Sequence, residues 1–117
     1  MRAVVTEPDT AVAMGSGDVP VLATPRLLAL AEAAAVAAVA PRLAEGFTSV
    51  GTSVSLEHRR ASPLGSEVLV EAQLTAVAGT LLSFSFIARA SDDRVVGAGT
   101  HERVVVERAA FLARVGG

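Results

Sequence analysis

Few side chains in this sequence could do chemistry, and one carboxylate stands out among them. Glu32 is the only ionisable residue in the apolar run from Leu27 to Ala40. Burying a carboxylate without a partner costs several kcal/mol, so such a group usually has either a partner or a catalytic role. The pattern therefore predicts a functional Glu32. The alternative is a helix whose single exposed edge carries this residue.

His58 is the second candidate for acid–base chemistry. A strand from Val50 to Leu56 would place its apolar even-numbered residues on one face, and His58 would follow on that face. This alternation points the imidazole toward the apolar side of the strand. A neutral imidazole is the usual general acid or base near pH 7. A histidine that simply belongs to the core or its rim fits the same pattern.

Thr24 and Gly51 each have a structural and a catalytic interpretation. Thr24 precedes Pro25 at the start of the apolar run, where its hydroxyl would act as an N-cap. At the same place, the helix dipole would favour negative charge on a substrate oxygen. Gly51 is either an ordinary strand glycine or a residue whose backbone N–H donates to a substrate carbonyl.

Other charged residues are interpreted as structural. His101, beside Glu102 and Arg103, is expected to belong to an ion pair at a strand edge, with a catalytic base as the alternative. Arg59 and Arg60 are expected to be solvated charges, with a cofactor phosphate as their alternative partner.

A helix must position Glu32, and the sequence predicts one from Pro25 to Ala40 that is buried on most sides. Pro41 would end it, because a residue before proline is pushed out of the helical region. Such a helix would be roughly 24 Å long. The hydrocarbon core of a membrane is ~30 Å thick, so a membrane span is not expected.

Strands are expected around this helix, with a lid-like loop near residues 15–18. The predicted strands comprise one or two short segments within 3–5 and 11–13, followed by 50–58, 67–74, 82–86 and 95–107. Turns are predicted at 78–79 and 91–93. The fold class is therefore α+β, a single domain over residues 1–117 in which an antiparallel sheet wraps around one long hydrophobic helix.

Composition excludes several classes of function. The 117 residues are 51% hydrophobic, carry a net charge of −2 and contain no cysteine, tryptophan or tyrosine. A nucleic-acid partner, disulfides, zinc–thiolate sites and cysteine nucleophiles are therefore not expected, and no metal-ligand spacing is present. The N-terminal stretch lacks the apolar region of a secretory signal, which predicts a cytoplasmic protein.

Several motifs together resemble one known family, the fluoroacetyl-CoA thioesterase-like branch of the hotdog-fold thioesterases. The resemblance covers residues 21 to 115. It rests on the following segments: Ala23-Thr24-Pro25, the helix with Glu32, Val50-Gly51-Thr52, His58, Ala61-Ser62-Pro63-Leu64-Gly65 and Gly97-Ala98-Gly99-Thr100-His101-Glu102-Arg103-Val104.

The resemblance implies a hotdog-fold homodimer that hydrolyses a short acyl thioester of coenzyme A. Thr24, Glu32 and His58 match the catalytic residues of the family. Gly51 matches the glycine whose N–H helps to hold the thioester carbonyl, and Arg103 matches an arginine near the pocket. Coenzyme A would be part of the substrate, with no separate cofactor. Glu32 would act either as a general base or as a nucleophile that forms a mixed anhydride.

One loop departs from the family pattern. Fluoroacetate-selective members carry phenylalanine in the loop before the helix, whereas residues 17–22 here contain no aromatic side chain. The sequence therefore predicts a broader short-chain acyl-CoA substrate. The alternatives are a hotdog dimer that binds acyl-CoA or another small apolar ligand without cleaving it, and a purely structural oligomer with an inert cleft.

Spacing along the helix adds a constraint on the site. Eight helical residues separate Thr24 from Glu32 by roughly 12 Å, which is far for two groups that act on one carbonyl. We therefore expect the site to span the interface of a two-fold dimer.

Overall fold

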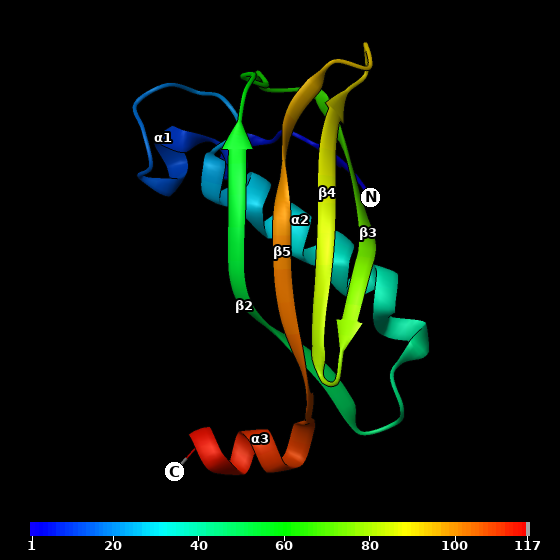
Figure 1. Cartoon of the computed structure of the whole chain (residues 1–117). Helices are drawn as coiled ribbons and strands as arrows, with labels where there is room; N and C mark the ends of the chain where they lie inside the picture. Colours follow the sequence, from blue (N-terminus) through cyan, green and yellow to red (C-terminus); the bar gives the residue numbers. More distant parts are fainter. Residues whose placement is uncertain (117) are drawn as a thin grey trace.

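The computed structural model describes residues 1–116, whose strands form one curled sheet around a central helix (Figure 1). In chain order the elements are β1 (Arg2–Val4), η1 (Glu7–Asp9), α1 (Ala11–Met14), α2 (Thr24–Val39), η2 (Ala40–Arg42), β2 (Phe47–His58), β3 (Glu67–Ala78), β4 (Leu81–Ala90), β5 (Val95–Glu107) and α3 (Arg108–Val115). The expected α+β architecture is thereby confirmed.

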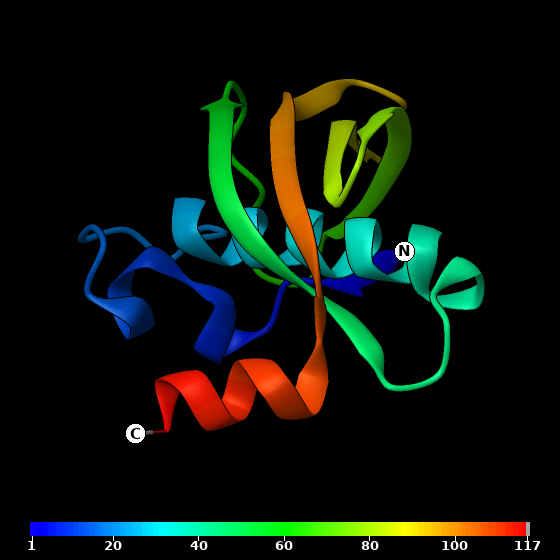
Figure 2. The same ribbon diagram turned by 60° about the horizontal axis from the view of Figure 1, so that its bottom comes forward.

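The sheet is antiparallel throughout, with the strand order β1-β3-β4-β5-β2. Although β2 precedes β3 in the sequence, it crosses to the far edge and pairs with β5. Figure 2 shows α2 running across the concave side of this sheet. Because β2 is an edge strand, one side of its backbone has no neighbouring strand within the described residues.

The core lies between α2 and the concave face of the sheet. One face of α2 is buried, through Leu27, Leu30, Ala31, Ala34, Ala35 and Val39. It packs against the inward residues of the central strands, among them Leu82, Phe84, Phe86 and Ala88 of β4.

The opposite face of α2 is open, and Val36 is 41% exposed there. The prediction of a helix buried on most sides is therefore wrong for the single chain. One sheet covers only one face of a helix, and nothing else in residues 1–116 lies over the apolar remainder. By length and composition, residues Thr24–Arg42 could also cross a membrane, but their buried face packs against the sheet as core helices do.

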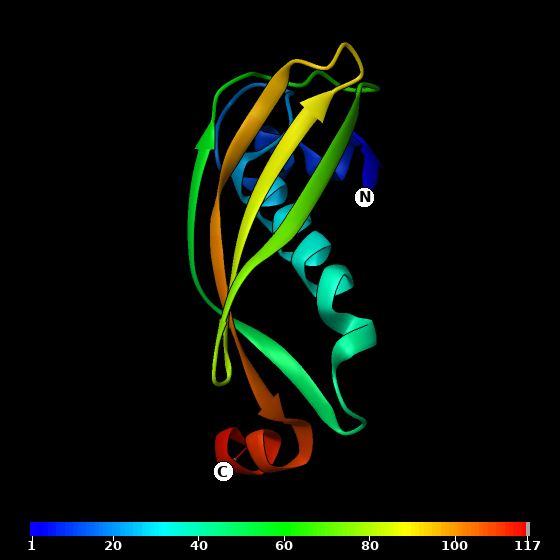
Figure 3. The ribbon, with the colours of Figure 1, turned by 45° about the vertical axis from the view of Figure 1, so that its right-hand side comes forward.

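The ends of several elements differ from the prediction. The N-cap of α2 is Ala23, so Thr24 is the first helical residue and not a cap. Residues 11–13 form part of the short helix α1 and not a strand. The helix α3 was not predicted at all; the Glu107 carboxylate caps it by accepting hydrogen bonds from two backbone N–H groups. Figure 3 shows α3 beyond the end of the sheet.

A β-bulge in β2 changes which residues face the helix. Gly51 pairs with Arg103 and Ser53 with Glu102, so Thr52 is an extra residue without a partner in the register. Beyond the bulge, Leu56 packs on the core as predicted. Before the bulge, the odd-numbered residues point toward α2. The prediction that Val50 shares a face with His58 is therefore wrong.

Two glycines of β5 allow a close approach of the neighbouring elements. A Cβ atom on Gly97 would lie 2.8 Å from the Glu57 carbonyl oxygen and 3.0 Å from Leu27 Cδ2. A Cβ atom on Gly99 would overlap the Ser55 carbonyl oxygen of the neighbouring strand. These positions keep β5 close to both β2 and α2.

Replacing a leucine in the core tests the packing of α2. Leu27 is fully buried, so Leu27→Ala should lower the free energy of unfolding by about 2–5 kcal/mol. Leu64 is 49% exposed, and the same change there should alter stability by less than about 0.5 kcal/mol. Urea denaturation measures both. Equal effects of the two substitutions would contradict the described core.

Candidate functional site

A hydrogen bond joins the start of α2 to the end of β2. The Thr24 hydroxyl lies 2.8 Å from Nδ1 of His58, although the two residues are 34 positions apart in the chain. Since Ala23 is the N-cap, the Thr24 hydroxyl has no capping role and is available to the imidazole. The other ring nitrogen, Nε2, is buried and has no hydrogen-bond partner in residues 1–116.

An open cleft of about 310 Å³ adjoins this pair. Thr24 and His58 line it together with the loop that precedes α2 and the segment that follows β2. The remaining lining residues are Ala11, Ser16, Gly17, Asp18, Val19, Val21, Leu22, Arg59, Arg60 and Ala61. The loop predicted as a lid therefore forms a wall of the cleft.

The surroundings of His58 favour its neutral form. Burial of the ring lowers the pKa of His58 below its ordinary value of 6.5, and the backbone of Arg60 acts in the opposite direction. A neutral imidazole beside a hydroxyl can accept or relay a proton near pH 7.

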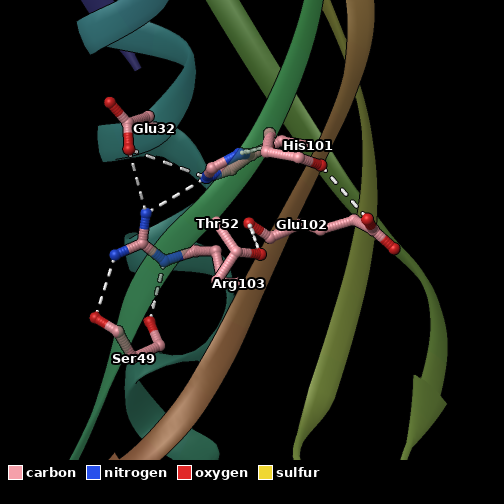
Figure 4. Close-up of polar contacts among 7 residues, drawn as sticks. Glu32, Ser49, Thr52, His101, Glu102 and Arg103 are labelled. Atoms are coloured by element: carbon pink, nitrogen blue, oxygen red, sulfur yellow. Dashed lines mark hydrogen bonds and ion pairs between the residues drawn. The ribbon is translucent and has the colours of Figure 1, made fainter.

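Glu32 belongs to a second group of polar residues, shown in Figure 4. Its Oε2 atom lies 3.4 Å from Nη1 of Arg103 and 3.9 Å from Nε2 of His101. The Glu32 side chain is 38% exposed. The carboxylate is thus half-buried and lies on an exposed edge of the helix. Arg103 is the charged partner that a buried carboxylate requires.

Arg103 is held in this group by Ser49. Its side chain is only 8% exposed. Nε donates to the Ser49 hydroxyl at 2.8 Å, and Nη2 donates to the Ser49 carbonyl at 2.9 Å. With Nη1 directed at Glu32, each nitrogen of the guanidinium has a protein partner.

His101 does not form the predicted ion pair at a strand edge. Its side chain is 2% exposed and stacks on Phe84, with ring centroids 6.1 Å apart. Nδ1 lies 2.8 Å from the Ser53 carbonyl and Nε2 lies 3.1 Å from Nη1 of Arg103. The carboxylate of the neighbouring Glu102 instead accepts hydrogen bonds from the hydroxyls of Ser53 and Ser83. Sequence reasoning missed this role of His101, although its alternation with the inward-facing Gly97 and Gly99 was a usable signal.

Gly51 allows β2 to approach Glu32. A Cβ atom at Gly51 would lie 2.7 Å from Glu32 Oε2, 3.2 Å from His101 Cε1 and 3.3 Å from Arg103 Nη1. Any side chain at this position would displace the carboxylate.

The predicted site residues therefore form two groups within one chain. Thr24 and His58 share the cleft, whereas Glu32, Gly51 and Arg103 lie together farther along α2, and none of these three lines the cleft. The first group offers a hydroxyl and an imidazole. The second offers a carboxylate beside an accessible strand backbone.

The two arginines that line the cleft each lie near a carboxylate. Arg59 lies 3.2 Å from Glu57, and Arg60 lies 3.5 Å from Asp92. Across residues 1–116, no group of three or more histidine or acidic side chains is arranged to hold a metal ion.

The sequence matches one known family over most of its length. Residues 5–109 match the family described as fluoroacetyl-CoA-specific thioesterase, FlK. The fluoroacetyl-CoA thioesterase of Streptantibioticus cattleyicolor is 41% identical over 95 residues, which are 81% of this chain and 68% of that protein.

Solved structures agree with this match. A phenylalanine-to-alanine mutant of FlK in complex with fluoroacetate and CoA superimposes with a TM-score of 0.91 at 34% identity, covering 98% of this chain and 94% of the other. A thioesterase superfamily member from Thermus thermophilus gives a TM-score of 0.91 at 27% identity, covering 98% and 85%. A hot-dog-like protein from Thermanaerovibrio acidaminovorans gives 0.89 at 27% identity, covering 98% and 84%. The hotdog fold expected from the sequence is confirmed.

The environment of His58 can be tested by titration. Because burial lowers the pKa of His58, its ring resonances should titrate with a midpoint below 6.5 in NMR spectra recorded against pH. An unfolded chain takes up this proton at higher pH than the folded one, so His58 should reduce the free energy of unfolding as the pH falls below 6.5. A midpoint above 6.5 would contradict the described burial.

Proposed function

Because the chain belongs to the fluoroacetyl-CoA-specific thioesterase family, we propose that it hydrolyses a short-chain acyl-CoA thioester to the free acid and coenzyme A. The observation that carries this proposal is the hydrogen bond between Thr24 and His58 at the edge of a cleft. It joins two of the residues that match the family's catalytic positions. No cofactor is required, since coenzyme A is part of the substrate.

In the proposed mechanism, the thioester carbonyl oxygen accepts a hydrogen bond from the backbone N–H of Gly51, and a helix N-terminus adds a favourable dipole. Glu32 supplies its Oε1 atom, because Oε2 faces Arg103 and His101. As a general base, Glu32 removes a proton from water while the water oxygen bonds to the acyl carbon. As a nucleophile, it forms a mixed anhydride that water then cleaves. In both courses the carbon–sulfur bond breaks and the coenzyme A thiolate leaves, taking up a proton.

His58 and Thr24 supply the proton transfers of this scheme. The neutral imidazole can carry a proton between water and the leaving sulfur, and the Thr24 hydroxyl holds the ring through Nδ1.

A homodimer would bring the two groups of residues together. Within one chain, Glu32 does not line the cleft of Thr24 and His58, so a complete site needs residues from a second copy. Two features support this arrangement. The edge of β2 is open for strand pairing, and the exposed apolar face of α2 includes Val36.

The acyl group is expected to be short but not specifically fluorinated. The loop wall of the cleft contributes Ser16, Gly17, Asp18 and Val19, with no aromatic side chain. Such a wall offers little apolar area with which to select one acyl group.

A thiol-release assay on a panel of acyl-CoA thioesters tests the activity. Glu32→Gln should lower kcat at least ~100-fold, because the amide can neither accept the water proton nor attack the carbonyl. His58→Asn should also lower kcat at least ~100-fold. The matched control Glu71→Gln alters an exposed carboxylate on β3 and should leave kcat unchanged. Tight acyl-CoA binding without thiol release by the wild type would instead support the non-catalytic binding module.

Mixing two inactive variants tests whether the site is shared between subunits. Glu32→Gln and His58→Asn proteins, unfolded and refolded together in equal amounts, should recover about one quarter of wild-type activity. Half of the dimers would be mixed, and one of the two sites in each mixed dimer would keep both native residues. If Glu32 and His58 of the same chain act together, mixing should restore no activity.

A further inference from the structure

The β-bulge in β2 is fixed by side chains of β5 on both of its sides. Arg103 donates to the hydroxyl and the carbonyl of Ser49, two residues before Gly51. His101 contacts the carbonyl of Ser53, two residues after Gly51. Figure 4 shows both β5 side chains reaching toward Glu32 between these contacts. A bulge displaces backbone groups from the regular ladder, so such contacts decide where the displaced groups lie.

The two nitrogens of His101 have opposite roles. Arg103 has only donors, so Nη1 at 3.1 Å requires Nε2 of His101 to act as the acceptor. Nδ1 then carries the proton and donates to the Ser53 carbonyl at 2.8 Å. His101 therefore links the bulged backbone to the guanidinium that holds Glu32.

Ser49 fixes the other edge of the same guanidinium. Two parallel hydrogen bonds, from Nε and Nη2, set the plane of the Arg103 head group. Nη1 is then directed at both Glu32 and His101. Without Ser49, the guanidinium of Arg103 could rotate about its terminal side-chain torsions. The Glu32 carboxylate, which Nη1 contacts, would then move with it.

We propose that Ser49 and His101 are positioning residues of the thioesterase site, which together hold the bulge at Gly51 and orient the Arg103–Glu32 pair. This inference rests on the proposed function and adds two residues to it. His101 is 2% exposed and Ser49 is buried, so neither touches substrate. They act through the placement of the Gly51 N–H and the Glu32 carboxylate, where a displacement of about 1 Å can cost about 100-fold in rate.

His101→Phe is the principal test. Phenylalanine can retain the stacking on Phe84 and loses both hydrogen bonds of the imidazole. The variant should lower kcat by about 100-fold and change KM less than about twofold, because coenzyme A contacts are untouched. In a ¹⁵N-labelled sample, the backbone amide resonance of Gly51 should also shift.

Two conservative variants separate the two bonds of His101. His101→Asn can still donate an amide N–H toward Ser53, and His101→Gln can still offer an acceptor to Arg103. Each should recover part of the kcat lost in His101→Phe. If His101→Phe does not fold, kcat is measured for these two variants in its place.

Ser49→Ala tests the other side of the bulge. It removes the hydroxyl that accepts from Nε of Arg103 and should lower kcat by about tenfold. The matched control is Ser83→Ala on β4. Its hydroxyl donates to Glu102 and makes no hydrogen bond with Arg103, His101 or Glu32. Ser83→Ala should leave kcat unchanged.

A double-mutant cycle shows whether His101 acts through Glu32. Glu32→Asp keeps a carboxylate and should retain measurable activity. In that background, His101→Phe should lower kcat much less than it does in the wild type, because the carboxylate is already displaced. Additive losses in the cycle would overturn the inference.

The outcomes also distinguish this inference from the proposed function. If the wild type releases no thiol from any acyl-CoA, the proposed function fails. A shift of the Gly51 resonance in His101→Phe would still support the role of His101 in holding the bulge. If the wild type is active and both His101→Phe and Ser49→Ala keep wild-type kcat, the proposed function stands and this inference is wrong.

Discussion

The rest of the site depends on the cost of burying the guanidinium of Arg103. A cation that is only 8% exposed must have hydrogen-bond partners, or the folded state loses several kcal/mol. The fold supplies them from three elements: Ser49 on β2, His101 on β5 and Glu32 on α2. These contacts tie the edge strand to the helix and leave the carboxylate at a defined place.

The bulge in β2 makes this arrangement possible. A regular strand would carry Gly51 and His58 on opposite faces, because side chains alternate along it. The extra residue Thr52 shifts the alternation, so that the Gly51 position faces Glu32 while Leu56, farther along, still packs on the core. A Cβ atom at this point would lie 2.7 Å from Glu32 Oε2, so a larger residue would displace the carboxylate. The same feature therefore sets the strand register and brings the strand backbone next to the acid.

Two exposed parts of the surface favour association with a second copy of the chain. The open edge of β2 and the exposed face of α2 are costly in isolation, since unpaired backbone and apolar surface both favour association. The split of the chemical groups has the same origin. A rigid helix keeps the Thr24 hydroxyl and the Glu32 carboxylate two turns apart, and packing against one sheet cannot bring them together.

The sequence alone determined the elements and the types of the reactive groups. The apolar run, its proline boundaries and the alternation in β3 and β4 reflect local physics, so the helix, these strands and the α+β class could be predicted. The roles of Glu32, His58 and Thr24 could be suggested for the same reason, because each stands out from its immediate neighbours.

Only the tertiary structure decided which of these groups meet. The prediction that Thr24 is an N-cap is wrong because the helix begins one residue earlier, at the N-cap Ala23, and the Thr24 hydroxyl bonds instead to His58, 34 residues away. The inward position of Ser49 could not be predicted because a bulge, and not the sequence alternation, sets the inward face of β2. Contacts of this kind depend on strand order and register across the whole sheet, and neither is encoded within a short stretch of residues.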